Sequence, residues 1–236
     1  KEYRRQRQMC IRDRSISDFT EKQALNFGYK GLFVRFPAWI NIDNYLNADT
    51  KRLSTGTFKI IFVGSVTERK NPKIIIESLE TIDEDISLEI IGQTPNLKYL
   101  KELNKLIASS KHAKSITMTP FIKAEELILK YSSANLFILP SKSEGLGRVI
   151  IEAQSTACPV LVSSNTGMTD LIIENETGYI FENDNKNDLT KKIQYIIDNY
   201  ESALQIGLNS KDFVKENQSV TNFEFGYKKL IDLVST

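Results

Sequence analysis

The sequence predicts an α/β fold with a doubly wound parallel sheet, because short apolar strands alternate with longer amphipathic helices from Phe58 onward. Three of the expected strands are almost entirely apolar: Phe58–Val63, Asn135–Leu139 and Pro159–Val162. Continuous apolar runs of this length are typical of parallel strands that are buried on both faces. The pattern therefore indicates a Rossmann-like domain, in which a ligand binds at the carboxyl edge of the sheet.

Turn and capping residues set the expected boundaries of these elements. Asn71–Pro72 and Thr94–Pro95 are typical helix starts, Gly92 ends a strand, and the capping box Thr221–Glu224 begins the last helix. The expected strands span 58–63, 87–91, 115–119, 135–139, 159–162 and 178–181. Helices are expected from 71 onward and over 95–108, 124–132, 148–156, 168–174, 187–199, 203–216 and 221–234.

The residues before this alternating domain follow a different pattern. Residues 15–57 hold a helix that starts near Ser17 and stops before Gly28, a strand over Gly31–Phe36, and then a polar and aromatic linker. One helix and one strand cannot bury a core, so we expect the tail of a preceding domain and its linker. Residues 1–14 are a basic leader, either a polybasic arm for lipid or nucleic acid or, as we prefer, a disordered or artefactual stretch.

Composition argues against several classes of function. The 236 residues carry a formal net charge of +1, which gives no support for a nucleic-acid partner. The single histidine, His112, excludes a histidine-cluster metal site and is expected in a solvated loop. The two cysteines are far apart in the sequence and favour a reducing compartment. No apolar run approaches the roughly 18–20 residues that span a bilayer, so a cytoplasmic location is expected.

Residues after the first strand predict a diphosphate site at the carboxyl edge. Gly64 permits a close backbone approach, and Arg69 and Lys70 precede a helix start, where the helix dipole favours anions over cations. Two cations fit there if they clamp a diphosphate, with bidentate contacts from Arg69 and a point charge from Lys70. A solvated basic turn is the alternative interpretation.

A second set of candidates lies in the stretch Ser141–Glu152, where a glycine-bearing turn follows an apolar strand and precedes a helix. Backbone N–H groups and the helix dipole make such a turn a natural phosphate site. Glu144 and Glu152 would accept hydrogen bonds from hydroxyl groups of a nucleotide sugar; alternatively, one is solvated and the other pairs with a lysine or arginine. After the third strand, Phe121 and Ile122 are placed to flank a nucleobase, although packing into the core explains Phe121 equally well.

Several further motifs occur in a fixed order along the chain: Gly64–Lys70, Ser141–Gly147, Glu152–Ala153, Ala157–Val160, Thr166–Ile172 and Thr177–Gly178. This ordered set resembles the family-4 retaining glycosyltransferases of the GT-B fold. The resemblance covers about Phe58–Glu216, and Ser15–Tyr45 resembles the end of that fold's first domain and the interdomain linker. It implies that 58–216 is the donor-binding, C-terminal half of a GT-B fold, and that 217–236 is a helix that crosses back toward the first domain.

The resemblance also implies a role for each candidate residue. Arg69 and Lys70 would neutralise the departing diphosphate and Glu144 would bind hydroxyl groups of the donor sugar, so these three are the expected catalytic residues. Glu152 would bind the ribose. The other expected substrate-binding residues are Gly64, Ser65, Phe121, Ile122, Gly145, Leu146 and Gly147.

The reaction implied is transfer of a sugar from a UDP- or GDP-linked donor to an acceptor hydroxyl, with retained anomeric configuration and without a metal or other cofactor. The expected partners are the nucleotide sugar and an acceptor glycan or lipid-linked glycan, with no nucleic acid. Bacterial cell-surface glycan synthesis would place the full-length protein in the cytoplasm, with peripheral contact at the inner face of the membrane. Because the first domain supplies the acceptor site in this fold, we expect little transferase activity from this chain alone.

Two departures from the family pattern leave room for other functions. Ser65 stands where many members have arginine, and Asn71 replaces the glycine that commonly follows the lysine. One alternative is a non-catalytic module that binds a nucleotide sugar. Another is a different GT-B enzyme, such as a sugar-nucleotide epimerase.

Overall fold

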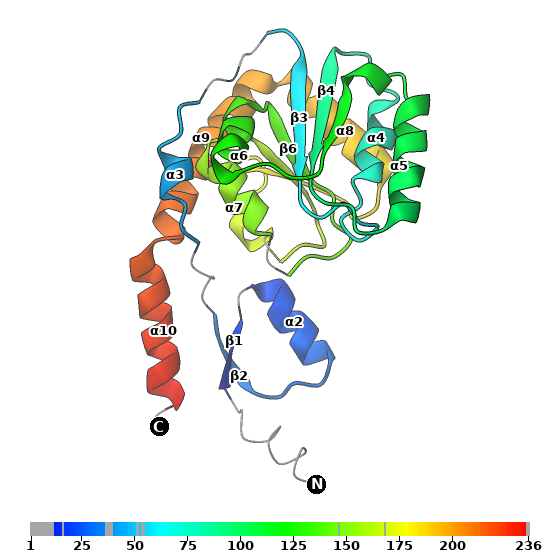
Figure 1. Cartoon of the computed structure of the whole chain (residues 1–236). Helices are drawn as coiled ribbons and strands as arrows, with labels where there is room; N and C mark the ends of the chain where they lie inside the picture. The colour runs from blue at the N-terminus through cyan, green and yellow to red at the C-terminus, as the bar shows by residue number, and fades with distance from the viewer. Residues whose placement is uncertain are drawn as a thin grey trace.

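The main body of the molecule is a six-stranded, fully parallel sheet with strand order β5-β4-β3-β6-β7-β8 (Figure 1). The computed structural model describes residues 12–15, 17–35, 40–50, 52, 55–145, 147–167 and 169–234. The strands are β3 (Phe58–Val63), β4 (Ile86–Ile91), β5 (Ile116–Thr119), β6 (Leu136–Leu139), β7 (Val160–Ser163) and β8 (Tyr179–Phe181). Strand order reverses between β3 and β6, so their carboxyl ends form the switch point at which such sheets bind ligands.

Helices cover both faces of this sheet (Figure 1). They are α4 (Lys73–Leu79), α5 (Leu97–Ser109), α6 (Ala124–Ser133), α7 (Arg148–Ser155), α8 (Lys186–Asp198) and α9 (Tyr200–Asn217). Helix α4 packs against α8, and α7 packs against both α6 and α9. The doubly wound α/β fold predicted from the sequence is therefore confirmed.

The hydrophobic core lies between the central strands and these helices. All four residues of β6 are buried, and Phe62 of β3 and Ile150 of α7 are completely inaccessible. Burying a side chain of this size stabilises the fold by about 1.5–3 kcal/mol. The rigidity of β3 and β6 matters for function, because the loops that follow these two strands carry the candidate catalytic residues.

A separate two-stranded parallel sheet precedes the main domain. Strand β1 (Arg12–Ser15) pairs with β2 (Leu32–Arg35), and α2 (Asp18–Asn26) connects them. The side chain of Ser17 caps α2 by accepting a hydrogen bond from the Thr20 amide at 3.2 Å. The last helix, α10 (Val220–Val234), packs against β1 and β2 beside the main domain (Figure 1). Residues 12–14, which we expected in the leader, thus belong to β1, and residues 1–11 lie outside the described part.

The segment between the two sheets is fixed to α6 and α7. It contains the short helix α3 (Asp43–Leu46), which contacts α7. Arg52 donates hydrogen bonds to the carbonyl oxygens of Tyr131 at 2.8 Å, Ala134 at 2.7 Å and Thr156 at 2.8 Å. These carbonyls lie at the C-terminal ends of α6 and α7, where helices leave acceptors without intrahelical partners. One guanidinium group therefore attaches the linker to the main domain and pairs carbonyl groups at the C-terminal ends of α6 and α7.

Predicted helix starts were wrong at three capping sites. Thr94–Pro95 does not start α5: the Asn96 side chain caps that helix by accepting the amide of Lys98 at 2.9 Å, and α5 begins at Leu97. Asn71 does not cap α4: Pro72 takes the N-cap position, and Asn71 adopts a left-handed conformation with φ 52. The last helix begins at Val220, one residue before the expected capping box, because the Ser219 hydroxyl oxygen accepts the amide of Asn222 at 3.2 Å and caps it instead.

The short helix expected over 168–174 is a 3₁₀ turn, Thr169–Leu171, and Met168 lies outside the described residues. The hydroxyl oxygen of Thr177 accepts the amide of Ile173 at 2.8 Å. This bond turns the chain toward β8 where an α-helix would have continued.

Candidate functional site

The loops that follow β3 and β6 are joined at the carboxyl edge of the sheet. The amide of Lys142, in the loop after β6, donates to the carbonyl oxygen of Arg69, in the loop after β3, at 2.8 Å. The loop after β7 is attached to the same place, since the Gly167 amide donates to the carbonyl oxygen of Glu144 at 2.6 Å. Three loops therefore meet at the switch point.

Arg69, Lys70 and Glu144 come together where these loops meet. The Lys70 ammonium donates to Oε2 of Glu144, and Nη1 of Arg69 lies 3.3 Å from the same oxygen. Arg69 also donates to the carbonyl oxygen of Ser143 at 2.6 Å. The Lys70 and Glu144 side chains are 11% and 12% exposed, whereas that of Arg69 is 56% exposed. Any anion that binds Lys70 must therefore compete with the Glu144 carboxylate.

Close backbone contacts fix the shape of this edge. A Cβ atom on Gly92, after β4, would lie 1.9 Å from the carbonyl oxygen of Gly64, after β3. A Cβ atom on Gly167 would lie 2.2 Å from the carbonyl oxygen of Gly145. No side chain fits at either position, so glycine is required for the loops to approach one another.

The turn before α7 has the backbone groups that the phosphate-site prediction requires. Gly147 is the N-cap of α7, and no side chain caps the amide groups of the first turn. Gly145 lies in the same turn, and Ser65 is exposed near the start of the loop after β3. Leu146, also expected to bind substrate, lies outside the described residues. Unpaired amide groups at a helix N-terminus are suited to an anion.

Glu152 lies apart from the cluster of Arg69, Lys70 and Glu144. Its carboxylate accepts a hydrogen bond from the Tyr131 hydroxyl at 3.4 Å. Burial raises the pKa of Glu152, and the nearby charge of Arg148 partly opposes this shift. Burial, followed by the charge of Glu152, also raises the pKa of Tyr45, in the linker helix α3, to about 12. The predicted ribose ligand is thus a half-buried carboxylate beside two tyrosines.

Phe121 and Ile122 differ in their surroundings. Phe121 is 72% exposed, which rules out the alternative that it packs into the core. Ile122 is partly buried and packs against the core. Both follow β5 at the carboxyl edge, so an aromatic ring is available to solvent on the side of the sheet that carries the candidate site.

Sequence reasoning missed two groups that contact these loops. Asp184, in the turn after β8, accepts hydrogen bonds from Asn71 and Lys142. Examining the residues after every expected strand would have found it, because the last strand ends at the same edge. Ser17, at the start of α2, packs against Gly167: a Cβ atom there would lie 2.8 Å from the Ser17 hydroxyl oxygen. Nothing in the sequence signals this second contact.

The lone histidine is part of the fold rather than a solvated loop residue. Nε2 of His112 lies 3.1 Å from the carbonyl oxygen of Leu79 and 3.3 Å from that of Ile82. A carbonyl oxygen can only accept, so this nitrogen donates to the chain at the end of α4, where the Leu79 carbonyl also accepts the Ile82 amide at 3.1 Å. Within the described residues, no group of three or more His, Cys, Asp and Glu side chains could hold a metal ion. In the same part of the chain, no helix is long and apolar enough to cross a membrane.

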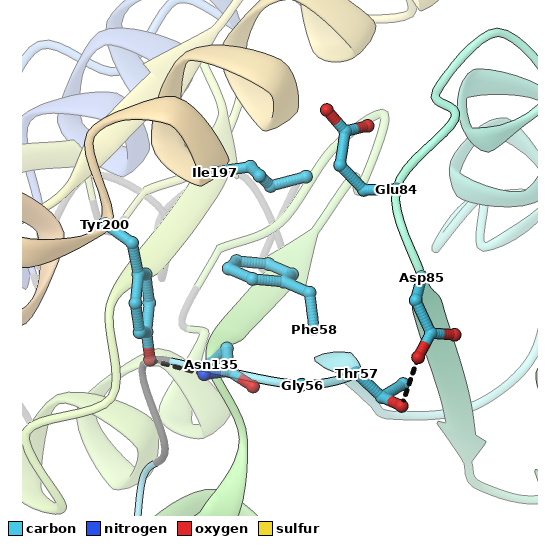
Figure 2. A pocket seen from close by; sticks show the side chains of 8 residues that line it. All are labelled: Gly56, Thr57, Phe58, Glu84, Asp85, Asn135, Ile197 and Tyr200. Carbon is cyan, nitrogen blue, oxygen red and sulfur yellow. Dashed lines mark hydrogen bonds between the residues drawn. The ribbon is translucent and has the colours of Figure 1, made fainter.

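A pocket of about 240 Å³ opens at the opposite edge of the sheet (Figure 2). Phe58 begins β3, and Asp85 and Asn135 directly precede β4 and β6, so the pocket lies at the amino ends of the strands. Two hydrogen bonds join polar groups of its lining: Asn135 donates to the Tyr200 hydroxyl at 2.7 Å, and Thr57 donates to Asp85 at 2.6 Å (Figure 2). The pocket is therefore separate from the loops at the carboxyl edge.

Comparison with known proteins gives a consistent assignment. Residues 47–213 match the family described as glycosyl transferases group 1. The chain is 26% identical over 157 residues to the D-inositol 3-phosphate glycosyltransferase of Pseudarthrobacter chlorophenolicus, an alignment that covers 64% of this chain and 37% of the relative. It is 27% identical over 184 residues to the capsular polysaccharide biosynthesis glycosyltransferase CapM of Staphylococcus aureus, covering 75% of this chain and 46% of the relative. The chain thus spans less than half the length of these relatives.

Solved structures show the same fold. HepE of Anabaena, in complex with UDP and glucose, matches with a TM-score of 0.80 at 16% identity, covering 94% of this chain and 62% of that chain. Sucrose-phosphate synthase from Thermosynechococcus elongatus matches with a TM-score of 0.78 at 22% identity, covering 94% of this chain and 57% of that chain. The main sheet is thus the Rossmann-like domain of a GT-B glycosyltransferase. Because the family match spans more than half of its length, this chain belongs to the glycosyl transferases group 1 family.

Proposed function

We propose that this chain is the donor-binding part of a retaining, family-4 glycosyltransferase that takes its sugar from a nucleoside diphosphate donor. The observation that carries the proposal is the meeting of Arg69, Lys70 and Glu144 at the switch point of the sheet. Two cations beside a helix N-terminus that no side chain caps are suited to a diphosphate. A carboxylate next to them is suited to the hydroxyl groups of the attached sugar.

In this proposal the chain's own residues act mainly by stabilising charge. Lys70 and Arg69 neutralise the negative charge that develops on the leaving diphosphate, which lowers the barrier because they are already in place. When the donor binds, before this step, Glu144 exchanges its contact with Lys70 for hydroxyl groups of the sugar. Glu152 binds the ribose, and Phe121 lies against the base. No metal or other cofactor takes part.

We propose the same division of the chain that the sequence suggests. Residues 15–57 are the tail of the first domain and its linker, 58–216 bind the donor, and 217–236 return toward the first domain. The acceptor site then lies in the first domain, so this chain alone transfers little sugar. Relatives such as CapM act in capsular polysaccharide biosynthesis, which supports an acceptor glycan, free or lipid-linked, in bacterial cell-surface synthesis. The full-length enzyme would work in the cytoplasm, in peripheral contact with the membrane.

The test is a calorimetric titration of the chain with UDP, GDP, ADP and their common sugars. HepE was crystallised with UDP and glucose, so UDP is the first ligand to try. We expect one nucleoside diphosphate to bind selectively, and both Glu152→Ala and the double variant Arg69→Ala/Lys70→Ala to weaken that binding. Unaltered binding in the double variant would refute the assignment of the diphosphate site.

A further inference from the structure

We infer that Asp184 is a positioning residue that holds the loops after β3 and β6 in register, an inference that rests on the function proposed above. Asp184 lies in the turn after β8, at the same edge of the sheet as Lys70 and Glu144. Its Oδ1 accepts a hydrogen bond from Nδ2 of Asn71 at 3.0 Å, and its Oδ2 accepts one from Nζ of Lys142 at 2.8 Å. A single carboxylate therefore contacts both loops.

Both partners of Asp184 are close in sequence to a candidate catalytic residue. Asn71 directly follows Lys70, and Lys142 precedes Glu144 by two positions. The placement of Lys70 relative to Glu144 therefore depends on where Asp184 holds these two neighbours. Because a small displacement of a binding group weakens its contacts, the loss of this link should reduce donor affinity.

The two contacts of Asp184 differ in how strongly they hold the loops. Asn71 is only 7% exposed, and its φ of 52 is a left-handed conformation that asparagine tolerates better than most residues. An unpaired amide at this buried position would be costly, so its bond to Asp184 is the stronger link. The Lys142 and Asp184 side chains are 46% and 50% exposed, and an ion pair as exposed as this contributes little by itself.

The turn that carries Asp184 is itself fixed. The Ser163 hydroxyl donates to the Asn183 side chain at 2.8 Å, and the Asn183 amide donates to the Ser164 hydroxyl oxygen at 3.1 Å. These bonds join the turn to the end of β7. Asp184 thus presents its carboxylate from a turn that is bonded to the end of β7, as a positioning residue requires.

The test uses Asp184→Gly, because glycine keeps the φ of 57 without strain and removes the carboxylate. Asn175→Gly is the matched control: Asn175 also has a left-handed φ, 63, but it is exposed in the turn before β8. Each chain is first analysed by hydrogen–deuterium exchange without ligand and then titrated with UDP. We expect Asp184→Gly to speed exchange in segments 66–72 and 140–147 and to weaken UDP binding about fivefold to tenfold. The control should change neither.

Two further variants separate the contacts. Asp184→Asn keeps an oxygen that can accept the Asn71 amide, so it should restore most of the UDP affinity. Asn71→Gly retains the backbone conformation but has no side-chain amide to hold. In that background Asp184→Gly should weaken UDP binding less than it does in the natural chain, and the remaining loss measures the contact with Lys142.

Three outcomes would overturn the inference. Unchanged exchange of both loops in Asp184→Gly would show that the carboxylate does not hold them. Faster exchange throughout the sheet would show a general loss of folding instead of a local role. If Asp184→Gly weakened UDP binding equally in the natural chain and in the Asn71→Gly background, Asp184 would not act through Asn71. If the natural chain prefers another nucleoside diphosphate, that ligand replaces UDP in these titrations. If it binds none of UDP, GDP and ADP, the proposed function fails for this chain, while the exchange experiment still decides the role of Asp184.

Discussion

Lys70 and Glu144 form an ion pair that joins the two central loops of the sheet, and both side chains are almost buried, at 11% and 12% exposure. Without a ligand, the lysine is already neutralised by a carboxylate. A diphosphate must therefore displace Glu144 before it gains the full charge of Lys70. In the proposed function, the pair keeps two charges satisfied in a largely buried site and releases the carboxylate toward the sugar when the donor binds.

Glu144→Gln tests this exchange. The variant removes the competing negative charge, so we expect it to bind free UDP about threefold to tenfold more tightly. The nucleotide sugar should gain less than UDP, because the carboxylate that receives its hydroxyl groups is also lost. Calorimetric titrations of both ligands measure the two affinities. The control is Glu89→Gln. Glu89 pairs with Lys130 at a distance of 2.9 Å, and this pair lies outside the candidate site. Weaker UDP binding in Glu144→Gln would contradict the exchange.

Lys70→Ala should reduce UDP affinity more than Arg69→Ala does. Lys70 is almost buried, and its removal leaves Glu144 facing the phosphate with only the exposed Arg69 beside it, so we expect UDP affinity to fall about 10- to 100-fold. The Arg69 side chain is 56% exposed, so its removal should cost only about threefold. Lys111→Ala, which breaks an ion pair with Asp83 at 2.7 Å, should leave binding unchanged. A larger effect of Arg69 than of Lys70 would reverse the assigned roles.

Phe121→Ala separates binding from folding. With 72% of the side chain exposed, truncation should change the free energy of unfolding by no more than about 0.5 kcal/mol. If the ring lies against the base, the same variant weakens UDP binding by about 1 kcal/mol or more. Leu129→Ala is the control, because Leu129 is also a large apolar residue, 66% exposed. Equal UDP affinities of the Phe121 and Leu129 variants would remove Phe121 from the site.

The raised pKa of Glu152 should make the stability of the fold depend on pH. Its carboxyl group loses a proton near the ordinary pKa of 4.5 when the chain is unfolded and at higher pH when burial raises the pKa in the fold. Between these two pKa values the folded state holds more protons, so stability falls as pH rises. Glu152→Gln cannot ionise and should raise the melting temperature at pH 7 by about 1–3 °C. The difference should vanish as pH falls to 4.5. Thermal unfolding at several pH values measures it, and a constant difference would contradict the burial effect.

The sequence was sufficient for the features that depend on local pattern. Continuous apolar residues over Asn135–Leu139 predict a buried parallel strand, and such strands place whatever follows them at one edge of the sheet. That rule alone predicts that the loops carrying Lys70 and Glu144 share one edge of the sheet. Gly147 as a helix start follows from the same reasoning.

What the sequence could not supply are contacts between segments far apart in the chain. Asn71 looks like a helix cap, but it adopts a left-handed conformation and its side chain binds Asp184, 113 residues further along the chain. The surroundings of Glu152 depend on Tyr45, which arrives from the linker. The sequence around His112 predicts a solvated residue, because nothing near it in the sequence indicates that its side chain contacts the end of α4. Each of these contacts is made by the tertiary fold.

The most direct test of the central claim compares a nucleoside diphosphate with its nucleoside on the natural chain and on Lys70→Ala. The pair to use is the one whose diphosphate binds most tightly in calorimetry, beginning with UDP and uridine. If Lys70 and its neighbours recognise the diphosphate, UDP binds the natural chain about 100-fold more tightly than uridine, and Lys70→Ala removes most of this difference. If the natural chain binds uridine as tightly as UDP, or if Lys70→Ala leaves the ratio unchanged, the diphosphate site is not where Lys70 and Glu144 meet.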